Sequence, residues 1–174
     1  MPYLNDQFEA YTLGESNEIL DITSKETLKD IALDLAQQSR RLVQILSREL
    51  DQVLYDDDDF IQALATTARR SRYSQIQILA HDSTTAVKNG HKLIQLHQRL
   101  SSYVHIRKIH YDHRDFNQAL LIVDETAFIH RLFADRFEAT VNYNDPLAAK
   151  QHSITFNEIW QISEPDPQVR RLNI

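Results

Sequence analysis

A continuous apolar run at residues 119–123, Ala-Leu-Leu-Ile-Val, constrains the fold of this chain more than any other feature. Five apolar residues without polar alternation are typical of a central strand that is covered on both faces of a sheet. A polar loop at residues 110–116 precedes the run, and Asp124 follows it. The run therefore favours a layered fold in which helices lie on both sides of a sheet.

Periodic patterns predict further helices and strands around this run. Strands are expected near residues 42–46, 75–80, 104–109, 127–133 and 137–143, with a turn at 134–136. Helices are expected at about 24–38, after the acidic tract 56–59, after Asp82 or Ser83, and from Asn144 or Asp145 with Pro146 in its first turn. The order α-β-α-β-α-β-β-β-β-α predicts an α/β domain with a mixed sheet flanked by helices.

Two local signals refine this prediction. Thr23 and Glu26 have the spacing of a capping box at the first helix. Gly90 lies inside the expected third helix, where it costs about 1 kcal/mol relative to Ala. Either a close helix crossing requires this glycine, or the helix is broken there. Residues 1–22 show no periodicity and are expected to form an N-terminal extension, so that 23–174 form one domain.

Composition excludes several classes of protein. The 174 residues contain no cysteine, which excludes disulfides, thiolate catalysis and cysteine-ligated zinc. The N-terminus lacks the pattern of a secretory signal, and no apolar stretch approaches the roughly 20 residues that span a bilayer. With only two glycines there is no glycine-rich phosphate loop, and no cofactor is expected. We expect a cytoplasmic protein without membrane contact.

Charge is strongly segregated along the chain. Residues 66–114 are basic between acidic flanks, although the whole chain has a net charge of −6. This basic block is a candidate for binding phosphate groups or nucleic acid, or it pairs with the acidic flanks of its own fold or of a second copy. The candidate anion-binding side chains are Arg69, Arg70, Arg72, Lys88 and Lys92.

Residues 117–124, Asn-Gln-Ala-Leu-Leu-Ile-Val-Asp, resemble the phospholipase D signature, in which a His, a Lys two positions later and an Asp five positions after that line up along a strand. The Asn-Asp-Pro at 144–146 and the Phe-Asn-Glu-Ile-Trp at 156–160 are similar to the start and end of the family's last helix. The resemblance covers roughly residues 40–163 and implies one half of a phospholipase D-like fold.

The chain departs from the family where the family's chemistry lies. The resemblance places the nucleophilic His at Asn117, the phosphate-binding Lys at Ala119 and a downstream Gly-Ser at Arg131-Leu132. An amide is not a nucleophile for phosphorus, and an alanine offers no charge to phosphate oxygens. The expected vestigial site consists of Asn117, Ala119, Asp124 and His130, with His130 hydrogen-bonded to Asp124. We therefore expect a non-catalytic interaction or regulatory module.

The resemblance also suggests partners. The segment around Ile76–Leu100 is similar to a bacterial branch of the superfamily whose members are sometimes encoded with acetyltransferase domains, so an acetyltransferase-type partner is expected. Family members with a single half pair two copies, which implies a homodimer.

An enzyme with a rebuilt site is the remaining alternative. The polar loop carries His110, Asp112 and His113, which are possible metal ligands by residue type, although their spacing matches no defined metal site. His81 and Asp82 follow an expected strand, where a helix N-terminus can hold an anion and where Asp82 or Ser83 can equally serve as a simple cap. Together with His130 these side chains are the candidates for rebuilt chemistry.

Overall fold

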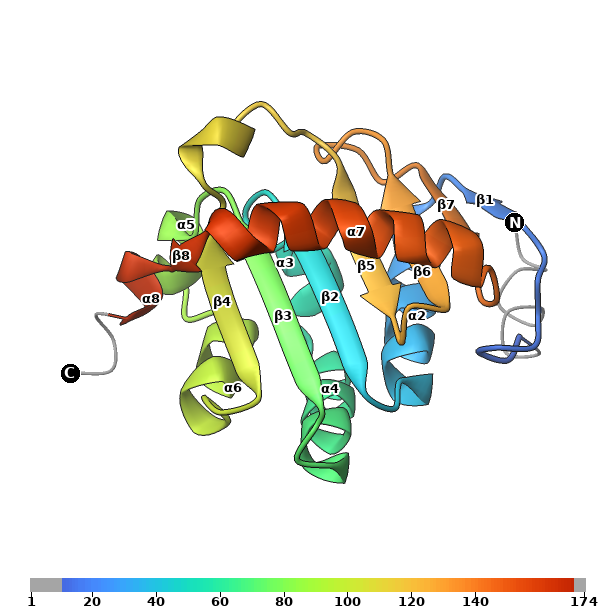
Figure 1. Ribbon diagram of the computed structural model, residues 1–174, viewed down its shortest axis with the longest axis horizontal. Coiled ribbons are helices and arrows are strands. Elements are labelled where there is room, and N and C mark those ends of the chain that lie inside the picture. Colours follow the sequence, from blue (N-terminus) through green and yellow to red (C-terminus); the bar gives the residue numbers. More distant parts are fainter. Residues whose placement is uncertain (1–10, 171–174) are drawn as a thin grey trace.

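An eight-stranded mixed sheet forms the centre of the computed structural model, which describes residues 11–170 (Figure 1). Its strands lie in the order β1-β7-β6-β5-β2-β3-β4-β8, and only the β2–β3 and β3–β4 pairs are parallel. The strands are β1 (Leu20–Ile22), β2 (Leu42–Ser47), β3 (Gln75–Ala80), β4 (Val104–Lys108), β5 (Ala119–Val123), β6 (Ala127–Arg131), β7 (Ala139–Asn142) and β8 (Glu164–Pro165). The predicted α/β fold with a mixed sheet is confirmed.

The helices form two unequal layers. They are α2 (Lys25–Gln38), α3 (Gln52–Tyr55), α4 (Asp58–Arg70), α5 (Thr84–Lys88), α6 (Lys92–Arg99), α7 (Pro146–Ile162) and α8 (Pro167–Arg170), with a 3-10 turn η1 (Tyr111–His113). Apolar residues of α2, α4 and α6 pack on one face of the sheet, and α7 crosses the other face (Figure 1).

Strand β5 is buried on both faces, as its apolar run predicts. Leu121 and Val123 contribute to the larger core beneath α2 and α4, while Leu120 and Ile122 contribute to the smaller core beneath α7. Alternating side chains of one strand thus join the two cores, because successive residues of a strand point to opposite faces.

Several local predictions need correction. The cap of α2 is Ser24, whose hydroxyl accepts a hydrogen bond from the Thr27 N–H, and not Thr23. Of the two alternatives at Gly90, the broken helix is confirmed, because α5 and α6 lie on either side of this glycine, whose φ of +65° is one that side chains disfavour. Residues 20–22, expected in the N-terminal extension, form the edge strand β1 and pair with β7.

The carboxylate of Asp124 ties the β5–β6 turn to the start of β2. Its two oxygens accept hydrogen bonds from three successive backbone N–H groups, those of Arg40, Arg41 and Leu42, at 2.8–2.9 Å. The Asp124 N–H in turn donates to the Leu42 carbonyl at 2.7 Å. Asp124 has a φ of 52° and Glu125 one of 50°, in the left-handed region that Asp tolerates better than most residues. Asp124 is therefore a structural residue.

Helix α7 is bound to the sheet through polar as well as apolar contacts. The buried Gln44 of β2 accepts a hydrogen bond from the Ser153 hydroxyl at 2.8 Å and donates one to Asn157 Oδ1 at 3.1 Å. Next to Ser153, the ring of His152 lies tilted against that of His130 of β6, with ring centroids 4.6 Å apart and an angle of 39° between the ring planes. This contact and the network at Gln44 fix how α7 crosses the sheet.

Replacing Asp124 should test its structural role. Asp124→Gly removes the three acceptor bonds without introducing backbone strain, and should lower the free energy of unfolding by about 1–3 kcal/mol. Asp124→Asn keeps one oxygen acceptor and tolerates the left-handed conformation, so it should lose less. Urea denaturation measures both values. An unchanged stability of Asp124→Gly would contradict this role.

The ring contact beneath α7 should make stability depend on pH. Burial, followed by the neighbouring His130, lowers the pKa of His152 from 6.5 to about 4. The unfolded chain then binds this proton more readily, so the contribution is present above pH 6.5 and is lost as pH falls towards about 4. His152→Gln should flatten the fall of Tm over that range, measured by calorimetry. His113→Gln, in the loop after β4, is the matched control and should follow the wild-type curve.

Candidate functional site

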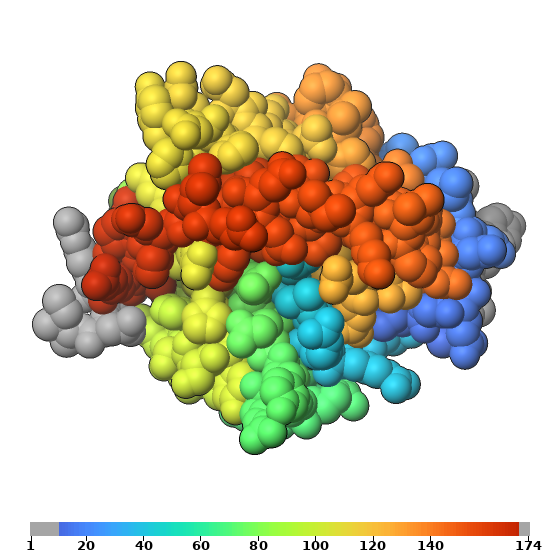
Figure 2. Space-filling model, in the orientation of Figure 1, coloured from blue at the N-terminus to red at the C-terminus, as the bar shows by residue number. Residues whose placement is uncertain are grey.

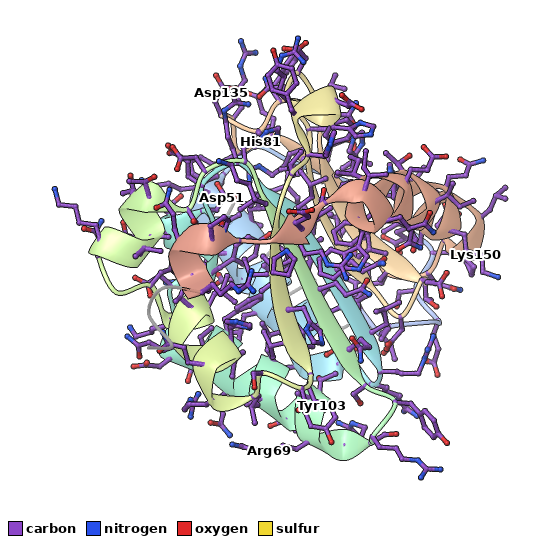
Figure 3. All side chains as sticks on the ribbon, turned by 60° about the vertical axis from the view of Figure 1, so that its left-hand side comes forward. Asp51, Arg69, His81, Tyr103, Asp135 and Lys150 are labelled. Carbon is purple, nitrogen blue, oxygen red and sulfur yellow. The ribbon has the colours of Figure 1, made fainter. Side chains whose placement is uncertain are left out.

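The carboxyl ends of the parallel strands β2 and β3 meet the start of β5 and the end of β6 at one edge of the sheet. We call this edge, with Arg48, Asp51, His81, Asn117 and Arg131, the carboxyl edge. Figure 3 shows Asp51 and His81 at this end of the molecule and Arg69 at the opposite end. Ligands of open α/β sheets commonly bind outside the carboxyl ends of strands, so this edge is the first candidate site.

Asn117, at the position that the resemblance assigns to the nucleophile, makes structural hydrogen bonds. Its side-chain oxygen accepts a bond from Arg48 Nη1 at 3.0 Å, and its carbonyl accepts one from the Ala134 N–H at 2.7 Å. Ala119, at the position of the phosphate-binding Lys, is buried and lies opposite Arg131 in the sheet. Neither position offers a nucleophile or a free cation.

A buried ion pair between Arg131 and Asp51 fills the interior of this edge. Arg131 is 2% exposed, and its Nη1 donates to Asp51 Oδ2 at 2.8 Å. The other two guanidinium nitrogens donate to the carbonyls of Arg136 and Ala134, each at 2.7 Å. The Ser47 hydroxyl also donates to Asp51 Oδ2 at 2.7 Å. These bonds offset the cost of burying the Arg131 charge, while the Asp51 side chain stays 17% exposed.

A buried histidine supports the loop that carries Asp51. His91 Nε2 donates to the Leu50 carbonyl at 2.8 Å, and its Nδ1 accepts from the Leu93 N–H at 3.1 Å. These two bonds define a neutral ring, and burial lowers the pKa of His91. Leu50 and Asp51 have φ values of 67° and 26°, which are strained for residues other than glycine. His91 thus anchors a strained turn that aims Asp51 at Arg131.

The His81 side chain is also hydrogen-bonded within the protein. Its Nε2 donates to the Phe116 carbonyl at 2.7 Å, which joins the end of β3 to the loop before β5. Burial is the main cause that lowers the pKa of His81, and the nearby Arg48 lowers it further. Asp82 accepts bonds from the Thr84 N–H and hydroxyl and so caps the turn that follows. The residues proposed for a rebuilt site serve here as links between loops.

The predicted bond between His130 and Asp124 is wrong. Asp124 lies beyond the last residue of β5, whereas His130 pairs with Leu120 near its first residue. At about 3.3 Å per residue, these positions lie toward opposite ends of the strand. His130 Nε2 instead donates to Gln118 Oε1 at 2.8 Å. The four residues of the expected vestigial site therefore do not form one pocket.

The predicted metal ligands do not form a site. His110 Nδ1 accepts a hydrogen bond from the Asp112 N–H at 3.0 Å, and His113 belongs to the same short turn. Within residues 11–170, no group of three or more His, Asp or Glu side chains is placed to hold a metal ion. His110 Nδ1 and the Asp112 carboxylate lie 3.6 Å apart, but no third ligand joins this pair among the described residues.

The five predicted anion-binding side chains separate into two groups. Lys92, the first residue of α6, lies beside Asp58 at the start of α4, with Nζ 3.6 Å from the carboxylate. Lys88 ends α5, the helix before α6. Arg69 and Arg70 are at the far end of α4, which is about 18 Å away at 1.5 Å per residue. Arg72 packs on the Tyr73 ring at 4.8 Å. The basic block does not form one continuous patch around these five residues.

No local pattern in the sequence predicts the Arg131–Asp51 pair, because its members are 80 positions apart in the chain. The resemblance drew attention to position 131, where Arg131 replaces an expected glycine, but it did not predict that Asp51 is the partner of Arg131. His91 was equally hidden, since a single histidine within a helical pattern is usually a packing residue. Burial and strained backbone, which only the fold reveals, identify both.

Several solved structures have a similar fold. An archaeal chromatin protein, TrmBL2, which shows a novel mode of DNA binding, matches with a TM-score of 0.64 and 16% identity over 94% of this chain and 56% of its own. Nuc, a phospholipase D family member from Salmonella typhimurium, matches with a TM-score of 0.63 and 12% identity over 86% of this chain and 97% of its own. NucT from Helicobacter pylori matches with a TM-score of 0.57 and 12% identity over 86% of this chain and 98% of its own.

These likenesses show the fold. The mixed sheet flanked by helices is that of phospholipase D-like proteins. This chain spans about half of the length of the chromatin protein but nearly all of Nuc and NucT. Among residues 11–170, no helix is long and apolar enough to cross a membrane. None of the curated proteins compared with the chain matches its sequence. Over residues 24–172 the sequence matches the model of the family DUF7931, a domain of unknown function, and the chain belongs to that family.

Proposed function

We propose that this chain is a non-catalytic phospholipase D-like domain that acts as an interaction module and associates with a second copy through α7. The observation that carries the first half is the carboxyl edge. Asn117 stands at the nucleophile position and is hydrogen-bonded to Arg48, while Arg131 is fully bonded within the fold.

Phosphodiester cleavage requires a nucleophile and free positive charge at one place. At the carboxyl edge, the imidazole of His81 and the guanidinium groups of Arg48 and Arg131 already donate to protein oxygens. A substrate phosphate would have to displace these bonds, and each charged bond contributes about 1.5–3 kcal/mol. These side chains therefore stabilise the carboxyl edge and are poorly placed to bind a substrate there.

An activity assay tests the absence of catalysis. We expect no hydrolysis of bis(p-nitrophenyl) phosphate above the buffer rate with Mg²⁺, Mn²⁺, Zn²⁺ or Ca²⁺, because nothing at the carboxyl edge attacks phosphorus. A phosphodiesterase of known activity serves as the positive control for the assay. Turnover that His81→Gln abolishes would contradict the proposal and support a rebuilt site instead.

The outer face of α7 supports the second half of the proposal. Leu147, Ile154 and Ile162 are 73%, 58% and 43% exposed, although a helix on a sheet normally turns polar residues outward. Figure 2 shows α7 as a ridge across one face of the molecule, and in Figure 3 Lys150 projects from it. An apolar stripe on a raised helix is typical of a surface that binds another protein.

The charges beside the stripe fit an antiparallel partner helix. Lys150 lies four residues before Ile154 and Glu158 four residues after it, and all three share the outer face. If two α7 helices cross at Ile154 about a two-fold axis, each Lys150 faces the Glu158 of the other copy. Neither side chain has an ion-pair partner within residues 11–170, so both are available for this contact. The stripe and its charges are self-complementary.

Charge reversal tests this association. Lys150→Glu and Glu158→Lys each place like charges together across the axis, and each should weaken dimerisation about tenfold or more. The double variant restores both pairs with exchanged signs and should recover the wild-type dimerisation constant, measured by sedimentation equilibrium. Lys29→Glu, on α2 at the other face of the sheet, is the control for net charge.

Two outcomes would contradict the proposed association through α7. One is a wild-type protein that stays monomeric at all concentrations measured. The other is a double variant that is as weak as the single variants, since independent charge effects would then explain the losses.

Other expectations rest on the sequence alone and belong to this proposal. They are an acetyltransferase-type partner and a cytoplasmic location in a bacterium. Nucleic-acid binding through residues 66–114 has less support, because the cations of that block lie at opposite ends of α4. The likeness to a DNA-binding chromatin protein concerns the fold.

A further inference from the structure

A polar pocket lies at the end of the sheet opposite to the carboxyl edge. We call it the amino-edge pocket, and it has a volume of about 450 Å³. It is an open hollow lined by the segment before β1, the end of α2, the end of α4 and the turn after β5. Its lining residues are Thr12, Leu13, Gly14, Gln37, Gln38, Arg40, Arg70, Asp124 and Thr126.

The walls of this pocket are held by specific hydrogen bonds. Gln38 Oε1 accepts from the Leu13 N–H at 2.8 Å, and its Nε2 donates to the Tyr11 carbonyl at 3.1 Å. The Gly14 N–H donates to the Tyr143 carbonyl at 3.0 Å. The segment at 11–14 is thereby bound to α2 on one side and to Tyr143, the residue after β7, on the other, so the pocket is a formed feature of the fold.

Two arginines of the lining are uncommitted. Within residues 11–170, the guanidinium groups of Arg40 and Arg70 have no carboxylate within ion-pair distance and no hydrogen-bond partner, whereas the neighbouring Arg41 lies 3.8 Å from Glu125. The carboxylate of Asp124 is also in the lining, but three backbone N–H groups already bind it. The pocket therefore presents positive charge whose partner is missing.

We propose that the amino-edge pocket binds a phosphate monoester through Arg40 and Arg70. A guanidinium donates two parallel N–H bonds to phosphate oxygens, and two guanidiniums match the charge of a dianionic terminal phosphate. The volume admits the phosphate group together with a small organic substituent. A nucleic-acid backbone would instead require a row of cations along an open surface, and this site is a hollow with two.

The site is independent of the proposed interaction module. It lies at the other end of the strands from Asn117, and its residues come from different elements than the α7 stripe. Loss of phosphate binding would leave the α7 association in place, and a monomeric protein would still carry this pocket.

Titration of the ¹⁵N-labelled full chain tests the site. The probes are inorganic phosphate, glycerol 3-phosphate and adenosine 5′-monophosphate at constant ionic strength, and glycerol is the uncharged control. We expect saturable shifts of the Gly14, Arg40 and Thr126 amide signals with the two monoesters. Saturation by inorganic phosphate as well would identify the phosphate group itself as the recognised part.

Matched variants separate the site from general electrostatics. Arg40→Gln and Arg70→Gln should each weaken binding about tenfold or more, since each removes a charged hydrogen-bond donor. Arg69→Gln removes the same charge from the same helix end but from outside the lining, and should leave affinity within about twofold. All variants should keep the dispersed wild-type spectrum, which shows that they fold.

Three results would overturn the proposal. The first is the absence of saturable amide chemical-shift changes with either monoester up to about 10 mM, a concentration at which even a millimolar Kd would be detected. The second is an equal loss of affinity in Arg69→Gln and Arg70→Gln. The third is binding of a single-stranded DNA oligonucleotide that depends on Arg40 and Arg70 while the monoesters do not bind.

Discussion

The bonds from Asp124 to three successive N–H groups of residues 40–42 determine how the two halves of the sheet meet. Strand β5 pairs antiparallel with β2, and β2 pairs parallel with β3, so the junction is the place where the sheet changes its sense. A one-residue slip of β5 would turn its core residues to the wrong faces. By holding one end of β5 in register, Asp124 also determines where the other end, at Asn117, arrives.

At that other end, the charged side chains are hydrogen-bonded within the protein. Arg131 donates with all three kinds of guanidinium nitrogen, and Asp51 receives both Arg131 and Ser47. The strained turn at Leu50 and Asp51 persists because the buried His91 holds it. Backbone strain of this kind often marks functional sites, but here it aims a carboxylate at an internal cation. Similar sheets in Nuc and in a chromatin protein show that function resides in such local sites and not in the fold.

The sequence predicted those features that depend on local periodicity. The apolar run of β5, the helical spacing of α2 and α4, and Asp145 with Pro146 at the start of α7 all placed elements correctly. Edge strand β1 has three residues and α3 has four, too few for a period to be visible. His130 was misplaced relative to Asp124 because the reach of a side chain depends on cross-strand register. The charge block at 66–114 was divided because Arg69 and Arg70 end α4, whereas Lys88 and Lys92 belong to α5 and α6, with Lys92 beside the start of α4.

The two ends of the sheet differ in whether the guanidinium groups of their arginines are hydrogen-bonded within the protein. At the carboxyl edge, Arg48 and Arg131 are bonded to side chains or carbonyls of the protein, and at the amino edge Arg40 and Arg70 are exposed and unpaired within residues 11–170. Charged groups that the fold has already satisfied have little left to offer a ligand. Asp124 contributes to this asymmetry, because its carboxylate is occupied by backbone N–H groups and does not neutralise the arginines beside it. The same interaction that holds the sheet together thus leaves positive charge free at the end of the sheet opposite to Asn117.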